Sequence, residues 1–217
     1  MSRAVAAGLV AGVGLAAMFA GPAAGKSQPA TTYIDQAKGY SITIPRTWQL
    51  IPRTEPQVKS LIAALDRKKS TVPLAETYQS ILSSSAGRSG LSTYRFQAFL
   101  WPLDGSTPLL TEVSLGIVPT HMAYGRSALP TIGATYANAL AQNTGSRVAV
   151  PKAVTLPEGP AELVVATIPA GEGLTNGVEL YLIPHGKKLY ELSFQIEASQ
   201  LASASLFTSI AQHFKLL

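Results

Sequence analysis

The stretch Gly39–Trp48, with the sequence GYSITIPRTW, decides how this chain folds. Its YSITI segment alternates apolar and polar residues, and this period of two predicts a β-strand with one buried face. Pro45 has no amide hydrogen to donate to a sheet, so it ends the strand or lies at an edge. Trp48 follows as a side chain of a type that is mostly buried. A glycine turn, a strand, a proline stop and a buried tryptophan therefore open the folded part of the chain.

The C-terminal part of the chain has the clearest strand pattern. In Leu189–Glu197, with the sequence LYELSFQIE, apolar and polar residues alternate from Tyr190 onward. Val178–Leu182 alternates in the same way, and the turn segment Pro184–Lys187 lies between the two. Ser199 is a suitable N-cap for a last helix. The apolar side of that helix is expected to carry Leu206, Phe207, Ile210 and Phe214. These features predict an antiparallel hairpin and a closing helix.

The middle of the chain contains helical and strand patterns in turn. Helices are predicted at 58–65, at 74–82 and at Ser127–Gln142, where apolar residues recur at helical spacing. Strands are predicted at Thr93–Trp101, Leu110–Val118, Arg147–Thr155 and Ala161–Pro169. The first two are expected to form an antiparallel hairpin, because the segment 102–108 between them is dense in turn residues. The serine- and glycine-rich segment 83–90 is expected to be a loop.

This order of elements predicts an α+β fold in which helices flank an antiparallel β-sheet. Gly39–Trp48 resembles the opening motif G-[FY]-s-h-x-h-P-x-x-W of PsbP-like domains, where h is an apolar residue. Segments 180–183 and 189–194, the Gly186 turn and the ending 213–216 resemble the closing hairpin and helix of that family. The resemblance implies a PsbP-like α/β/α sandwich, the Mog-type fold.

The resemblance also implies a class of function. PsbP-like domains are mostly not enzymes. They include an extrinsic lumenal subunit of photosystem II, a nuclear-transport regulator and many exported bacterial proteins. No catalytic residue and no cofactor come with the family. The resemblance therefore implies an accessory or binding protein.

The first residues have the layout of a secretory signal peptide. Met1–Arg3 is a short positive region, Ala4–Ala20 has no charged side chain, and Ala23–Gly25 offers small residues to a signal peptidase. We predict a signal peptide over 1–25, a polar linker over 26–32 and a single domain over 33–217. The alternative is an uncleaved membrane anchor over 4–20, although this run is just short of the ~20 residues of a spanning helix. Either way, we expect an exported domain in the periplasm, the cell envelope or the medium.

The composition excludes several classes of protein. The chain has no cysteine, which excludes a disulfide framework, a thiolate metal site and a cysteine nucleophile. Its net charge of +5 comes from basic residues that are dispersed, apart from clusters at 67–69 and 187–188. A nucleic-acid-binding surface usually concentrates such charge, so we expect no nucleic-acid partner. Weak attraction to an anionic envelope surface is consistent with the positive excess.

Residues that commonly build catalytic or metal sites are scarce. The three histidines, His121, His185 and His213, lack the spacing of a metal-binding pair. No G-x-S-x-G nucleophile motif is present. The glycine-rich segment 171–177 joins two predicted strands, so it lacks the helix N-terminus of a phosphate loop. We expect no enzyme activity. The alternative is a hydrolase-type envelope enzyme with a histidine and carboxylates brought together from distant segments.

The candidate binding residues are Arg95, Phe99 and Trp101, which share one face of a predicted strand. If no helix covers that face, it suits a partner protein or a small ligand such as a glycan. If a helix covers it, the two aromatic residues belong to the core. We therefore predict an exported, non-catalytic accessory protein that acts through a sheet face or loops on an envelope or membrane-associated partner or a small ligand. A membrane-tethered structural domain is a further alternative.

Overall fold

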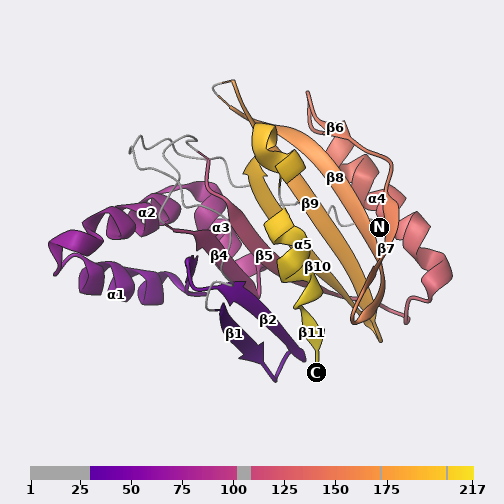
Figure 1. Cartoon of the computed structure of the whole chain (residues 1–217), viewed down its shortest axis with the longest axis horizontal. Helices are drawn as coiled ribbons and strands as arrows, with labels where there is room; N and C mark the ends of the chain where they lie inside the picture. Colours follow the sequence, from indigo (N-terminus) through magenta and orange to yellow (C-terminus); the bar gives the residue numbers. More distant parts are fainter. Residues whose placement is uncertain (1–29, 102–108, 172, 204) are drawn as a thin grey trace.

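The computed structural model describes residues 30–101, 109–171, 173–203 and 205–217. The predicted signal peptide, the first part of the predicted linker, the turn segment 102–108 and Glu172 lie outside these described residues. Within them, two antiparallel sheets and five α-helices form a layered α+β structure (Figure 1).

The strands are β1 (Ala30–Asp35), β2 (Tyr40–Pro45), β3 (Trp48–Leu50), β4 (Phe96–Leu100), β5 (Glu112–Pro119), β6 (Arg147–Val148), β7 (Lys152–Leu156), β8 (Gly159–Gly171), β9 (Leu174–His185), β10 (Lys188–Glu197) and β11 (Lys215–Leu216). The α-helices are α1 (Glu55–Leu65), α2 (Val72–Ser83), α3 (Ser85–Thr93), α4 (Leu129–Ala141) and α5 (Ser205–Gln212). Short 3-10 turns are η1 (Lys69–Thr71), η2 (Arg126–Ala128) and η3 (Ala198–Ser203).

The opening stretch of the sequence forms the centre of the smaller sheet, whose order is β1-β2-β11. Gly39 turns the chain with φ +77°, a conformation that glycine adopts without strain. Tyr40 and Ile42 then lie fully buried in β2, and Trp48 is buried at the start of β3. The predicted strand and buried tryptophan are thus confirmed. The predicted linker ends too late, because Thr31 and Thr32 already pair with Ile44 and Thr43 in β1.

The larger sheet has eight strands in the order β3-β4-β5-β10-β9-β8-β6, and β7 pairs with β8 outside this path. The predicted hairpins β4–β5 and β9–β10 are both present and antiparallel. The region predicted as one strand, Arg147–Thr155, is divided into β6 and β7, which pair with different parts of β8. Strands β8, β9 and β10 form a continuous antiparallel meander, and β10 is the central strand of the order.

Helices cover both faces of the larger sheet. Helix α5 packs on one face through Phe207 and Ile210, which join the side chains of β4, β5 and β10 in the main core. The opposite face is covered by α4 at one end and by α1 to α3 at the other (Figure 1). The predicted α/β/α sandwich is confirmed.

Helix α3 corrects the prediction of a loop over 83–90. Ser84 caps the helix, since its Oγ accepts a hydrogen bond from the amide of Gly87 at 2.9 Å. A Cβ at Gly87 would lie 2.1 Å from the carbonyl oxygen of Ile81, so glycine permits the close approach of α2 and α3. Composition alone indicated a loop because serine and glycine have low intrinsic helix propensity. The closing helix also differs, because η3 precedes it and α5 begins at Ser205.

Candidate functional site

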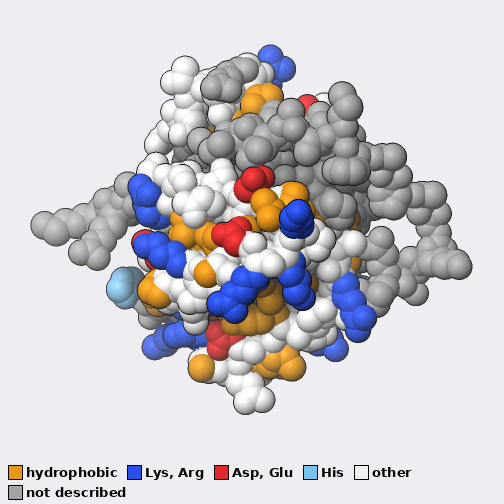
Figure 2. Space-filling model, turned by 90° about the vertical axis from the view of Figure 1, so that its left-hand side faces the viewer, with side chains coloured by type: hydrophobic (Ala, Val, Ile, Leu, Met, Phe, Trp, Pro, Cys, Tyr) orange, Lys and Arg blue, Asp and Glu red, His pale blue; other side chains and the backbone are white. Residues whose placement is uncertain are grey.

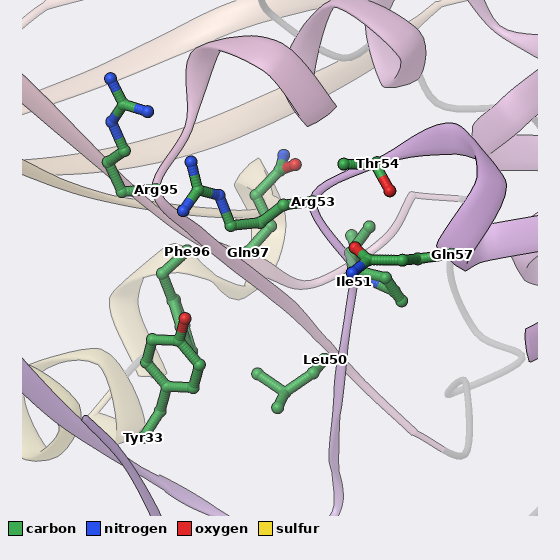
Figure 3. Close-up of a pocket in the computed structure, with 10 residues that line it drawn as sticks. Tyr33, Leu50, Ile51, Arg53, Thr54, Gln57, Arg95, Phe96 and Gln97 are labelled. Carbon is green, nitrogen blue, oxygen red and sulfur yellow. The ribbon is translucent and has the colours of Figure 1, made fainter. Parts of the chain in front are cut away.

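A pocket of about 650 Å³ opens where β1, the end of β3, the first turn of α1 and the start of β4 meet (Figure 3). Its volume lies within the usual range of small-molecule sites, ~300–1,000 Å³. The residues that line it are Tyr33, Leu50, Ile51, Pro52, Arg53, Thr54, Gln57, Arg95, Phe96 and Gln97. They come from three separate segments of the chain, so the pocket forms only in the folded domain.

Backbone hydrogen bonds hold the pocket walls together. The amide of Ile51 donates to the carbonyl of Gln97 at 2.9 Å, which joins the segment after β3 to β4. The amide of Arg95 donates to Leu115 at 2.7 Å, and the carbonyl of Arg95 accepts from the Tyr40 hydroxyl at 3.1 Å. Tyr78 of α2 donates to the carbonyl of Leu50 at 2.6 Å. The backbone of each wall is therefore fixed.

Two arginines give the pocket its charge. In Figure 3, Arg53 and Arg95 lie on the same side of the pocket. Arg53 is exposed and Arg95 is half-buried. Within the described residues, neither guanidinium makes a hydrogen bond to a protein atom or an ion pair; the ion pair found there joins Lys59 to Glu55 on α1. None of the ten lining residues is acidic. The pocket therefore presents uncompensated positive charge.

Both arginines also act electrostatically on the Tyr40 hydroxyl. Burial raises the pKa of Tyr40, and Tyr33 and Asp35 add to the rise, whereas Arg53 and Arg95 both oppose it. Both guanidinium groups thus act on the same buried point beside the pocket. The carboxylate of Asp35 lies outside the lining, and its Oδ1 accepts a hydrogen bond from the Lys38 amide at 3.0 Å.

The remaining wall is mainly apolar. The ring centroids of Tyr33 and Phe96 are 5.3 Å apart, and Phe96 is buried in the main core. Leu50 is 39% exposed, a large value for a leucine in a strand, and it lies in the pocket lining. Figure 2 shows the side of the molecule that lies on the left in Figure 1, where Lys and Arg side chains border apolar patches. The pocket thus combines an apolar wall with a positively charged one.

Gln97 connects the pocket to a buried carboxyl group. Its Nε2 donates to Oε1 of Glu112 at 2.9 Å, and both residues are buried. Burial raises the pKa of Glu112 to about 7, and the hydrogen bond from Gln97 opposes the rise. This carboxyl therefore changes its protonation near neutral pH. Tyr94 also lies near Glu112, and burial raises its pKa to about 12.

The structure separates the three residues that the sequence proposed as one binding face. Arg95 lines the pocket. Phe99 is 0% exposed, and its ring packs edge-on against Tyr78 of α2 at 5.3 Å. Trp101 is half-buried and packs edge-on against Phe99 at 6.5 Å. Because α2 covers this face, Phe99 has no exposed surface for a partner, and both aromatic residues match the core alternative.

Sequence reasoning did not find Arg53, Tyr33 or Gln57. A signal was present in the segment Ile51–Thr54, where a proline and an arginine precede a predicted helix. That pattern alone is common at the start of helices. Only the pairing of Ile51 with Gln97 shows that this segment lies against Arg95.

Among the described residues, the histidines and the glycine-rich segment that the sequence raised as alternative sites are not brought together. His121, His185 and His213 are all exposed: His121 follows β5, His185 is the last residue of β9, and His213 follows α5. In the part of the chain that the structure describes, no group of three His, Asp or Glu side chains is placed to hold a metal ion. The glycine-rich segment lies between the antiparallel strands β8 and β9, and Gly171 pairs with Leu174.

No helix among the described residues is long and apolar enough to cross a membrane.

Comparison with known proteins finds likeness at the level of the fold. No family model and no curated protein matches the chain. The solution structure of cyanobacterial PsbP from Synechocystis sp. PCC 6803 matches with a TM-score of 0.52 and 11% identity, over 91% of this chain and 98% of that one. This likeness confirms the PsbP-like fold.

Two further solved structures match. A crystal structure of a protein from Bacteroides thetaiotaomicron has a TM-score of 0.50 and 9% identity over 86% of this chain. This chain spans 48% of the length of that protein. LpqN of Mycobacterium tuberculosis, described as involved in cell envelope biogenesis, has a TM-score of 0.46 and 10% identity, over 87% of this chain and 86% of that one.

Proposed function

We propose that the chain is an exported, non-catalytic accessory protein that binds a small ligand in the pocket between β1, β3, α1 and β4. The observation that carries the proposal is the lining itself. It brings four polar side chains together in one pocket of about 650 Å³: Arg53, Thr54, Gln57 and Arg95. In a site built for binding, a few convergent polar groups stand against an apolar wall, and this pocket has that composition.

Apart from Gln97, which binds Glu112, the polar side chains of the pocket are not tied into the fold within the described part of the chain. The Thr54 side chain makes no capping hydrogen bond to α1. The guanidinium groups of Arg53 and Arg95 have no ion pair within the described ranges. Side chains that the fold leaves unused at a concave surface are available to a ligand. An envelope or membrane-associated protein would be the partner that supplies or receives this ligand, in keeping with an exported accessory role.

A pocket-filling substitution tests the proposal. Gln57 is an exposed residue of α1 that points into the pocket in Figure 3, so Gln57→Trp is expected to fill the pocket without disturbing the core. Gln79→Trp is the matched control, because Gln79 is an exposed residue of α2 outside the lining. Both proteins and the wild type would be exported, isolated gently and examined by native mass spectrometry.

The expected result is a bound small molecule on the wild type and on Gln79→Trp, and none on Gln57→Trp. Equal occupancy of all three proteins, or no bound molecule on any, would contradict the proposal. The intact mass from the same spectra tests export. A chain that begins at Lys26 is expected, and the mass of the full chain would refute cleavage after Gly25.

A further inference from the structure

We propose that the pocket is selective for a small molecule with an oxyanion head, a phosphate or a carboxylate, on an apolar body. This inference rests on the proposed function and names the class of ligand. The oxyanion would lie between Arg53 and Arg95, and the apolar body would lie against Tyr33, Leu50 and Phe96.

The head group follows from the two guanidinium groups. Each arginine offers planar, paired N–H donors that match the oxygens of a phosphate or carboxylate, and the group stays charged at every physiological pH. Arg53 and Arg95 come from different segments, and both act electrostatically on the Tyr40 hydroxyl. The carboxylate that acts on the same hydroxyl, Asp35, is outside the pocket lining. A bound anion would therefore meet two cations and no carboxylate in the lining.

The fold holds the backbone at both arginines in place before a ligand binds. The backbone of Arg95 is held on both sides, by its amide bond to Leu115 and its carbonyl bond from Tyr40. The segment of Arg53 is held through the Ile51–Gln97 bond two residues earlier. Restrained binding groups lose less conformational freedom on binding. The Oγ of Thr54 and the amide of Gln57 lie in the same lining and can add neutral hydrogen bonds to the head group.

The apolar wall of the pocket indicates an apolar body for the ligand. Tyr33 presents its ring, which packs on the buried ring of Phe96, and Leu50 exposes 39% of its surface in the same lining. A purely inorganic anion would leave this apolar surface in water, whereas an alkyl or aryl group would cover it. The hollow shape favours a discrete small molecule over a flat membrane surface, because a bilayer cannot enter a pocket between β1 and α1.

Isothermal titration calorimetry with defined probes tests the inference on the mature chain. The probes are hexyl phosphate, inorganic phosphate and hexanol, with vesicles of phosphatidylglycerol and phosphatidylcholine as a membrane probe. The proteins are wild type, Arg53→Gln, Arg95→Gln, Arg53→Lys, Gln57→Trp and the control Arg126→Gln. Arg126 is exposed at the start of η2, outside the pocket lining.

We expect hexyl phosphate to bind more tightly than either inorganic phosphate or hexanol. Each Arg→Gln change should weaken this binding about tenfold to a hundredfold, as expected for the loss of a charged hydrogen-bond pair. Arg53→Lys should fall between the wild type and Arg53→Gln, since lysine keeps the charge but not the paired donors. Gln57→Trp should abolish binding and Arg126→Gln should leave it unchanged.

The contrary results separate the two proposals. If hexanol binds as well as hexyl phosphate, and the arginine variants bind normally while Gln57→Trp does not, the oxyanion inference is refuted and the pocket function stands. If no probe binds, or Gln57→Trp binds hexyl phosphate normally, both are refuted. Binding to anionic vesicles without binding to hexyl phosphate would overturn the small-molecule ligand in favour of a membrane surface.

Discussion

The two faces of the larger sheet bury different kinds of side chain. The face under α5 is apolar and aromatic: Phe194 stacks on Phe207 with ring centroids 4.7 Å apart, and Tyr190 packs against Phe214 at 5.8 Å. The opposite face has two separate apolar clusters, one under α4 and one under α1 to α3. The same face carries the buried polar side chains Gln97, Glu112, Ser114 and Gln195.

The two faces contribute differently to the stability of the domain. Burial of apolar side chains stabilises the domain through the α5 face. On the opposite face, each buried polar group must find a partner or destabilise the domain. Glu112 has Gln97, and Glu191 accepts a hydrogen bond from the Tyr136 hydroxyl. Because Gln97 also lines the pocket, the buried polar side chains of this face extend to the candidate site.

The largest loss of stability should come from removing an aromatic side chain from the apolar face. Phe194 is 0% exposed and packs against Phe207 and Tyr181. Phe194→Ala is expected to reduce the free energy of unfolding by about 3–5 kcal/mol, because it removes apolar contacts and leaves a cavity. Urea unfolding followed by circular dichroism would measure it. Lys187→Ala, in the exposed β9–β10 turn, is the control, and a loss below about 1 kcal/mol for Phe194→Ala would show that α5 is not central to the core.

The next largest effect should be a pH dependence of stability that originates at Glu112 on the polar face. The pKa of Glu112 is about 7 in the folded protein, above its ordinary value of 4.5. The folded protein therefore binds more protons than the unfolded chain between these values, and stability should fall as pH rises from 4.5 to 7. The expected change is on the order of 3 kcal/mol at most.

Glu112→Gln tests this origin, since glutamine keeps the shape of the side chain without the titration. We expect the variant to lose much of the pH dependence in urea unfolding at pH 5, 6, 7 and 8. What is left would come from Glu179 and Glu191, whose pKa values burial also raises. The exposed Glu76 serves as the control in Glu76→Gln. An unchanged slope in Glu112→Gln would exclude Glu112 as the source.

A smaller loss of stability is expected at the half-buried carboxyl of Glu191. Tyr136→Phe removes the hydroxyl that donates to Glu191 and should reduce the free energy of unfolding by about 1–2 kcal/mol. The loss should be larger at pH 8 than at pH 5, because an ionised Glu191 loses more when its donor is removed. An equal loss at both values would mean that Tyr136 contributes through packing alone.

The smallest effect on stability should be at the pocket. Arg53→Gln is expected to change the free energy of unfolding by no more than about 0.5 kcal/mol, because Arg53 is exposed and makes no ion pair among the described residues. Thermal unfolding without ligand measures this directly. A large loss would identify Arg53 as a structural residue and weaken its assignment to binding.

The sequence predicted most of the fold but only one residue of the site. Alternation in β2 and β10 and helical spacing in α1, α2 and α4 reflect which side chains face the core, so these elements were correctly placed. Helix α3 was not, because its stability depends on the close approach of Gly87 to α2. Arg95 was selected for its strand neighbours, yet its role in the pocket depends on Arg53, which lies 42 positions earlier and joins it only through tertiary contacts. A site of this kind carries no local motif.

The most direct test of the pocket assignment is a ¹H–¹⁵N correlation spectrum of the mature chain during titration with hexyl phosphate. We expect saturable shifts at the amides of Tyr33, Arg53, Gln57 and Arg95–Gln97, with the β8–β9 hairpin unchanged. Shifts centred on any other surface, or a spectrum that stays unchanged up to high probe concentration, would contradict the claim that this pocket is the binding site.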